Sequence, residues 1–147
     1  SEMCIRDRPD IASKGVVVMY YYPEPEQSPW GEVQHCRELC PGVFQVSTAG
    51  HGGIMARTER SVFSTAAKKY GVRESGYLCF EEDCAAAVAL RELLDKRLCK
   101  APEHYTPEEY DNAVNGTIQR FYPEYWKARE RAMAQAVFLP HREDIGR

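Results

Sequence analysis

The chain has 147 residues and carries 19 Lys and Arg against 22 Asp and Glu, a formal net charge of −3. With 44% hydrophobic and 28% charged residues, the composition is typical of a folded globular protein and excludes long disordered stretches. The longest apolar run, at 16–22, is far shorter than the roughly 20 residues of a membrane-spanning helix, so we expect no membrane partner. The scattered basic residues likewise argue against nucleic acid as a partner.

Residues 1–18 are expected to be a non-native or disordered leader. Residues 1–8, SEMCIRDR, look like a translated sequencing adaptor of the kind met in metagenomic reading frames, and Met19 begins a plausible native start. We therefore expect one domain over 19–139, followed by a tail at 140–147. No segment has the pattern of a secretory signal, which predicts a cytoplasmic protein with reduced cysteines.

The first part of the chain predicts a strand, a helix and a hairpin. A short aromatic strand is expected at 19–22. Residues 28–40 predict a helix, because they open with Ser-Pro, have apolar residues at helical spacing and are followed by Pro-Gly. Residues 43–48 predict a strand, and 54–56 predict its hairpin partner.

The rest of the chain is mainly helical in pattern. In order, we expect a helix from Thr58 or Ser61 to Tyr70, a strand at 77–80, a helix that starts at 81–83 and carries Leu90, Leu93, Leu94 and Leu98, a helix that Thr106 caps, and a helix from Pro123. This order predicts an α+β fold, with a small antiparallel sheet of three or four short strands packed by helices and a helical C-terminal third.

The segment STAGHGG at 47–53 is the most informative motif. Gly50, Gly52 and Gly53 surround His51, so the backbone is expected to turn sharply there or to approach another group closely. Exposed N–H groups in such a bend can bind an anionic group, and an imidazole at its tip can carry a proton or bind a metal ion. The alternative is a hairpin turn whose glycines supply positive φ angles and whose histidine is merely exposed.

Three consecutive acids, Glu81, Glu82 and Asp83, follow the strand predicted at 77–80. Such a cluster can hold a divalent cation or act as a general base. The alternative is that the acids favour the N-terminus of the next helix, with Asp83 as its cap. Because consecutive helical side chains point about 100° apart, we expect that not all three face one site.

Two further candidates lie in the predicted helix at 28–40. Trp30 either walls a pocket or belongs to the core. Cys36 and Cys40, next to His35, would share a helix face, but no second ligand pair follows them. We therefore predict no metal site there and no cofactor.

Four blocks of sequence resemble one known family. They are WGEVQH at 30–35, PGV at 41–43, VST at 46–48 with HGG at 51–53, and FEED at 80–83. Together they resemble an uncharacterised domain family encoded on bacterial phages, plasmids and conjugative elements, and the resemblance extends over 30–94. It implies a mobile-element accessory protein in a bacterial cytoplasm and implies no particular reaction.

Two classes of function remain open. The first is a protein-binding or regulatory module with an unknown protein partner, which the lack of a complete catalytic set favours. The alternative is a small hydrolase-type enzyme with His51 and Glu82 as catalytic residues. In that case Trp30, Gly50, Gly52, Gly53, Glu81 and Asp83 would form the binding residues. A distance of about 2.6–3.2 Å between the His51 ring and a carboxylate would favour the enzyme.

Overall fold

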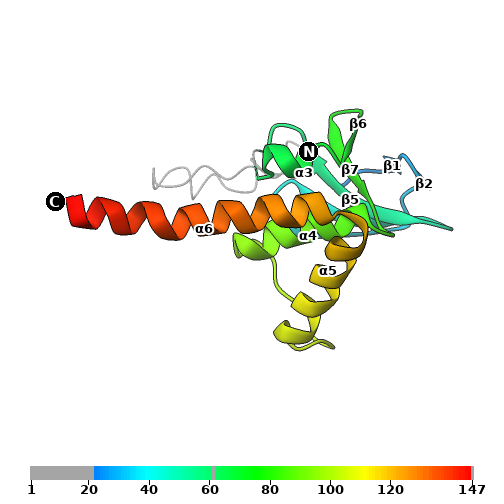
Figure 1. Cartoon of the computed structure of the whole chain (residues 1–147). Coiled ribbons are helices and arrows are strands. Elements are labelled where there is room, and N and C mark those ends of the chain that lie inside the picture. Colours follow the sequence, from blue (N-terminus) through cyan, green and yellow to red (C-terminus); the bar gives the residue numbers. More distant parts are fainter. Residues whose placement is uncertain (1–21, 61, 147) are drawn as a thin grey trace, which may run out of the picture. The chain divides into compact units, whose positions relative to one another are not determined.

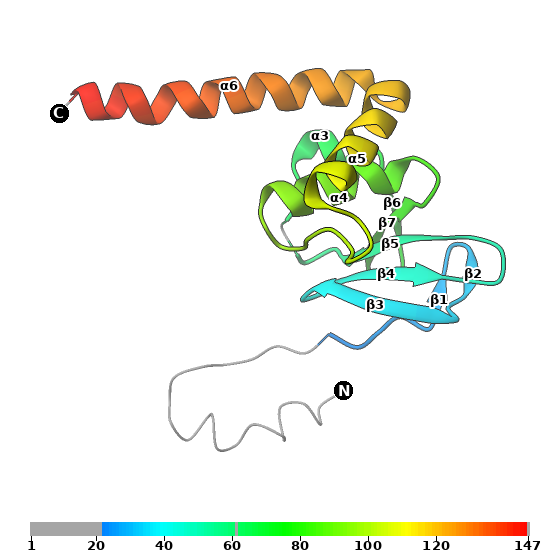
Figure 2. The same ribbon diagram turned by 90° about the horizontal axis from the view of Figure 1, so that it is seen from below.

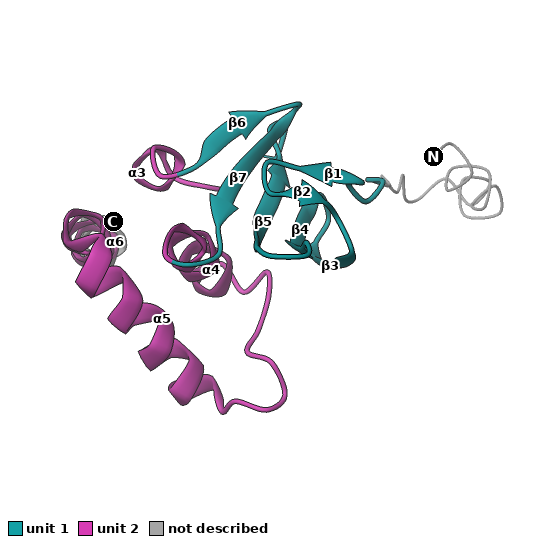
Figure 3. Cartoon of the chain, turned by 90° about the vertical axis from the view of Figure 1, so that its right-hand side faces the viewer, with its two compact units in different colours: residues 1–62, 71–83 teal, residues 63–70, 84–147 magenta. Residues whose placement is uncertain are grey.

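The structure, a computed structural model, describes residues 22–60 and 62–146 (Figure 1). The predicted leader and the Met19 start lie outside these residues. The described chain forms two compact units, which Figure 3 colours separately. Unit 1 takes in residues up to Val62 together with 71–83, and unit 2 takes in 63–70 and the chain from Cys84 onward. The single domain predicted for 19–139 stays a prediction.

Unit 1 consists of antiparallel strands. They are β1 (Gln27–Ser28), β2 (Gly31–Glu32), β3 (His35–Cys40), β4 (Val43–Ser47), β5 (Gly52–Arg57), β6 (Val72–Glu74) and β7 (Tyr77–Glu81). β1 and β2 form a two-stranded ribbon, and the other five form one sheet in the order β3-β4-β5-β7-β6 (Figure 2). The strands predicted at 43–48, 54–56 and 77–80 are confirmed, but the sheet is larger than the three or four strands expected.

The helix predicted for 28–40 is wrong. The Ser28 hydroxyl accepts a hydrogen bond from the Trp30 N–H and donates one to the Gly31 carbonyl, which closes a tight turn between β1 and β2. Gly31 has a φ of +121°, which a right-handed helix does not allow. Beyond this turn, β3 pairs with β4, so long-range pairing overrides the helical spacing of the apolar residues.

One face of the five-stranded sheet carries a compact apolar cluster. Its buried members alternate along β4, β5 and β7, as side chains on one face of a sheet must: Phe44, Val46, Met55, Tyr77 and Cys79. Trp30, Val33 and Cys36 pack against this cluster and stay partly exposed. The first part of unit 1 is therefore anchored to the sheet by apolar contacts.

Cys36 and Cys40 do not share a face, as they would on the predicted helix. A register shift in β3 pairs Cys36 with Val46 and Cys40 with Val43, and these two valines lie on opposite faces of β4. Both cysteines are free thiols. Burial, with added repulsion from Glu24 and Glu38, raises the pKa of Cys36 to about 11, so this thiol is protonated and unreactive at neutral pH.

Unit 2 is helical, which completes the predicted α+β class. Its helices are α3 (Thr65–Lys68), α4 (Ala85–Asp95), α5 (Pro107–Phe121) and α6 (Pro123–Gly146). Helix α3 is shorter than expected, and its cap is Ser64, which accepts from the Ala67 N–H. Helix α4 ends before Leu98, while Leu93 is fully buried as predicted. Within the described chain, no helix is both long and apolar enough to cross a bilayer.

The capping box predicted for α5 is confirmed and gives a testable stability effect. The Thr106 hydroxyl accepts from the Glu109 N–H at 3.1 Å, and the Glu109 carboxylate accepts from the Thr106 N–H at 3.0 Å. We expect Thr106→Ala to lower the free energy of unfolding by about 1 kcal/mol in urea denaturation. The control is Thr117→Ala, which removes an exposed bond to the Ala113 carbonyl inside the same helix. An equal loss in both variants would contradict the capping role.

Arg91 is the charged residue at the centre of unit 2. It is 6% exposed and contacts Asp95 on its own helix and Asp111 and Asn115 on α5. Arg129 of α6 also binds Asp95 through two hydrogen bonds of 2.8 Å. Arg91 therefore ties α4 to α5, and Asp95 ties α4 to α6.

The stability of this network should depend on pH. Burial alone would raise the pKa of Asp95, but hydrogen bonds and charge from Arg129 and Arg91 lower it below its ordinary value of 3.8. The ionised group therefore contributes stability above this ordinary value, and the contribution is lost as the pH falls through the lowered pKa. We expect Asp95→Asn to have a lower free energy of unfolding than the parent at pH 6. This difference should disappear below about pH 4. The exposed control Glu103→Gln should show no such gap; a constant gap for Asp95→Asn would refute this account.

Candidate functional site

His51 projects from the turn between β4 and β5, and Thr48 holds its backbone. The Thr48 N–H donates to the His51 carbonyl at 2.7 Å, and the Thr48 hydroxyl donates to the same oxygen at 3.0 Å. The His51 N–H in turn lies 3.2 Å from the Thr48 hydroxyl oxygen, which accepts its hydrogen bond. The imidazole therefore stands on a fixed backbone. Sequence reasoning missed Thr48, although a Thr three residues before the His is a signal for such a turn.

Two of the three glycines around His51, Gly52 and Gly53, are required by close packing. Positive φ angles among the described glycines occur at Gly31, Gly42 and Gly76, so the interpretation of a hairpin whose flanking glycines supply positive φ is wrong. Gly52 and Gly53 lie in β5. A Cβ on Gly53 would collide with the Phe80 carbonyl and lie 2.5 Å from the Trp30 ring, whereas Gly50 has open space. The anion-binding role expected for their N–H groups stays a prediction.

Trp30 lies beside His51, although it sits in the β1–β2 turn and not in a helix. Its ring approaches the His51 ring edge-on, with centroids 6.1 Å apart and planes at 76°. The absence of a side chain on Gly53 leaves the room that the indole occupies. Trp30 thus places an apolar ring beside the imidazole and also packs on the apolar cluster of unit 1, so its role as the wall of a pocket stays a prediction.

The pairing of β5 with β7 brings the acids to His51. Glu81 is in register with Gly53, and the Glu82 N–H donates to the Gly52 carbonyl at 3.0 Å. Glu82 and Asp83 follow in the turn after β7. Helix α4 begins only at Ala85, its cap is Cys84, and its first turn contains no acid. The interpretation of Asp83 as a helix cap is therefore wrong.

All three acids lie around the imidazole. The His51 Nε2 atom is 3.1 Å from Glu81 Oε2, and the Nδ1 atom is 3.6 Å from Glu82 Oε2. One ligand atom each from His51, Glu81 and Asp83 lies within 4.8 Å of the others. Glu82 lies at the other ring nitrogen and outside this group, so the three acids do not all face one point. They occupy a strand end and a turn in place of the nascent helix that was expected. The His51 side chain is 31% exposed, so solvent and small ligands reach it.

The arrangement has two chemical uses. A neutral imidazole has one donor and one acceptor nitrogen, and a carboxylate faces each of them here. The donor nitrogen is oriented by its carboxylate, while the other nitrogen can accept a proton from a reactant. Alternatively, a cation can occupy the space between that nitrogen and the neighbouring carboxylates.

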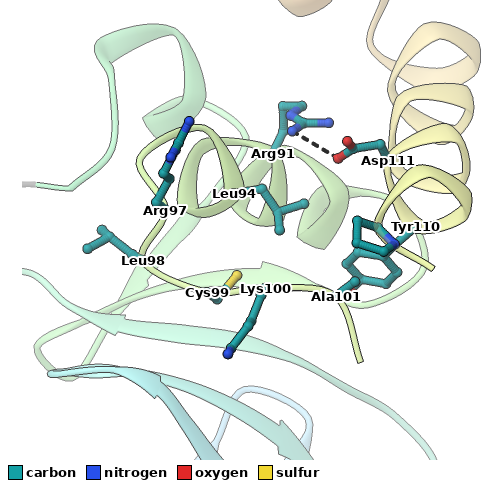
Figure 4. Close-up of a pocket in the computed structure, with 10 residues that line it drawn as sticks. Arg91, Leu94, Arg97, Leu98, Cys99, Lys100, Ala101, Tyr110 and Asp111 are labelled. Atoms are coloured by element: carbon teal, nitrogen blue, oxygen red, sulfur yellow. Dashed lines mark ion pairs between the residues drawn. The ribbon is translucent and has the colours of Figure 1, made fainter. Parts of the chain in front are cut away.

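Unit 2 contains a cavity of about 430 Å³ that sequence reasoning did not foresee (Figure 4). Arg91, Arg97, Lys100 and Asp111 contribute charged groups to its lining. Arg91 forms an ion pair with Asp111, while Arg97 and Lys100 point away from each other (Figure 4). The charged groups do not converge on one point, so this cavity is a weaker candidate than the His51 cluster.

Comparison with known proteins identifies the family of this chain. Neither the curated proteins nor the solved structures include a chain that matches this one. A family model described as Domain of unknown function (DUF7007) matches residues 23–142, which include Trp30, His51 and the three acids. The match confirms the resemblance to an uncharacterised domain family, and the chain belongs to the DUF7007 family.

Proposed function

We propose that the protein is a small hydrolase-type enzyme that works through His51 and the acids around it. The observation that carries the proposal is the distance of 3.1 Å between His51 Nε2 and Glu81 Oε2. It lies within the range of about 2.6–3.2 Å in which a carboxylate orients a catalytic imidazole. Trp30 adds an apolar wall on one side of the ring.

In the proposed reaction, His51 acts as the general base. It takes a proton from a water molecule whose oxygen attacks the electrophilic carbon of the substrate. The bond to the leaving group then breaks, and His51 returns the proton to that group. Glu81 lies within hydrogen-bond distance of Nε2 and orients the ring, which leaves Nδ1 to take the proton. Glu82 Oε2 lies 3.6 Å from Nδ1. Three carboxylates at the site favour a neutral or cationic substrate over an anionic one.

The experiment measures hydrolysis by the purified full chain on chromogenic ester, amide and glycoside substrates. We expect His51→Ala to lower the rate by about 10²- to 10⁴-fold and Glu82→Gln to lower it less. Glu103→Gln, an exposed acid in unit 2, is the matched control and should retain the parent rate. The proposal fails if the parent hydrolyses none of these substrates, or if His51→Ala is as active as the parent.

The second candidate is a protein-binding accessory protein of a bacterial mobile element, acting in the cytoplasm. It is supported by two large apolar side chains that unit 2 leaves exposed, Phe121 at 49% and Met133 at 47%. In this role, Met133→Asp should lose a partner protein that the parent captures from phage-infected or plasmid-bearing cells, while His51→Ala should still capture it. Loss in His51→Ala alone would contradict this second candidate.

A further inference from the structure

We infer that His51, Glu81 and Asp83 together bind one divalent transition-metal ion, with Glu82 as a positioning residue for the imidazole. The inference rests on the proposed function's choice of site and goes beyond it, because an ion on Nε2 would make His51 a ligand in place of the general base. It names the ion that the site would take, and it makes a claim about binding that holds whether or not hydrolysis is observed.

The first argument is the geometry of the three ligand atoms. An imidazole nitrogen and two carboxylate oxygens lie within 4.8 Å of one another. Two neighbouring ligands on an octahedral ion, each at about 2.1 Å, lie roughly 3.0 Å apart. The His51–Glu81 distance of 3.1 Å matches this spacing. Asp83 is exposed, so its side chain can rotate to complete the set.

The second argument is the surroundings of the imidazole. Glu81 Oε2 lies 3.1 Å from Nε2, and Glu82 Oε2 lies 3.6 Å from Nδ1. An ion bound to Nε2 and Glu81 would leave Glu82 on the side of the other ring nitrogen. Metal-binding histidines usually have such a carboxylate partner on the other nitrogen.

The third argument is the rigidity and charge of the site. Thr48 fixes the backbone of His51 through hydrogen bonds, and Glu81 is paired with Gly53 at the end of a ladder. Two of the three ligands are therefore placed before any ion arrives. A divalent cation would also offset the repulsion among the Glu81, Glu82 and Asp83 carboxylates.

The donor set points to the class of ion. One imidazole with two carboxylates suits Zn²⁺ or Mn²⁺, while Mg²⁺ and Ca²⁺ prefer oxygen ligands alone. Three protein ligands leave coordination positions for water, as in catalytic metal sites and unlike closed structural ones. We therefore expect Zn²⁺ and Mn²⁺ to compete for the same position.

The test uses Mn²⁺ as the probe, because it avoids the thiols that also attract Zn²⁺. The metal-free full chain is titrated with Mn²⁺ under electron paramagnetic resonance, and Zn²⁺ is then added as a competitor. We expect one Mn²⁺ per chain, displaced by Zn²⁺, with affinity at least 10-fold weaker in His51→Ala and Asp83→Asn and about 10- to 100-fold weaker in Glu82→Gln. The control His35→Ala changes a histidine of the same unit and should bind like the parent.

Circular dichroism and thermal unfolding of each variant separate lost ligands from lost folding. The inference is overturned if the folded parent binds neither Mn²⁺ nor Zn²⁺, or if folded His51→Ala binds them as the parent does. Hydrolysis that depends on His51 without any bound ion would overturn the inference and keep the proposed function. An ion bound at His51 without hydrolysis of any substrate would support the inference and overturn the proposed function.

Discussion

Gly53→Ala is expected to lower the free energy of unfolding by about 3 kcal/mol, at the upper end of the range for overpacking. The added methyl group would meet the Phe80 carbonyl and lie 2.5 Å from the Trp30 ring. The carbonyl belongs to the neighbouring strand β7, so it cannot yield without disturbing the β5–β7 ladder that carries Glu81. Urea denaturation of both proteins measures the effect.

The matched control is the same substitution where space is open. Gly116 lies inside helix α5, and a Cβ there meets no atom within 4 Å. Because Ala favours a helix over Gly, Gly116→Ala should raise the free energy of unfolding by up to about 1 kcal/mol. We therefore expect the free energy of unfolding to fall in Gly53→Ala and to rise in Gly116→Ala. A Gly53→Ala protein as stable as the parent would refute the close approach of Trp30 and Phe80.

Phe44→Ala is the second large effect, with an expected loss of about 3–5 kcal/mol. Phe44 is fully buried in the apolar cluster and is in register with Met55 on β5. Truncation leaves a cavity that the paired strands cannot close. The control is Val72→Ala on the edge strand β6, where the side chain is 62% exposed and the loss should stay within about 0.5 kcal/mol.

Phe44→Ala should also loosen the packing of Trp30 beside His51, because Trp30 packs on the apolar cluster that contains Phe44. The chain has two tryptophans, so in a Trp126→Phe background the fluorescence reports on Trp30 alone. We expect Phe44→Ala to shift this emission to the red and Val72→Ala to leave it unchanged. Unshifted emission in a destabilised Phe44→Ala protein would show that Trp30 does not depend on the cluster.

Local patterns predicted the elements whose boundaries are set locally. The strand at 43–48 and the capping box at Thr106 are specified by neighbouring residues, so the sequence alone indicated them. The segment 28–40 shows the limit of such patterns. Its Ser-Pro start and apolar spacing are typical of a helix. The segment forms strands instead, because it pairs with β4 and turns at Gly31.

The candidate site was only partly predictable, because it also depends on strand pairing between distant parts of the chain. The residues His51, Glu81 and Glu82 were identified by type, and the structure brings them together. Their meeting depends on the β5–β7 register, a long-range property that no local motif specifies. The acids were expected at the start of a helix, but the structure places them at a strand end and in a turn.

The central claim is that the His51 imidazole and the acids after β7 form one site. Long-range proton–nitrogen spectra of the imidazole rings test it most directly, because ring nitrogens respond to the loss of a neighbouring charge. We predict that Glu81→Gln and Glu82→Gln each shift the His51 ring nitrogens and leave those of His35 and His104 in place. His51 ring signals that stay unchanged in both variants would contradict the claim.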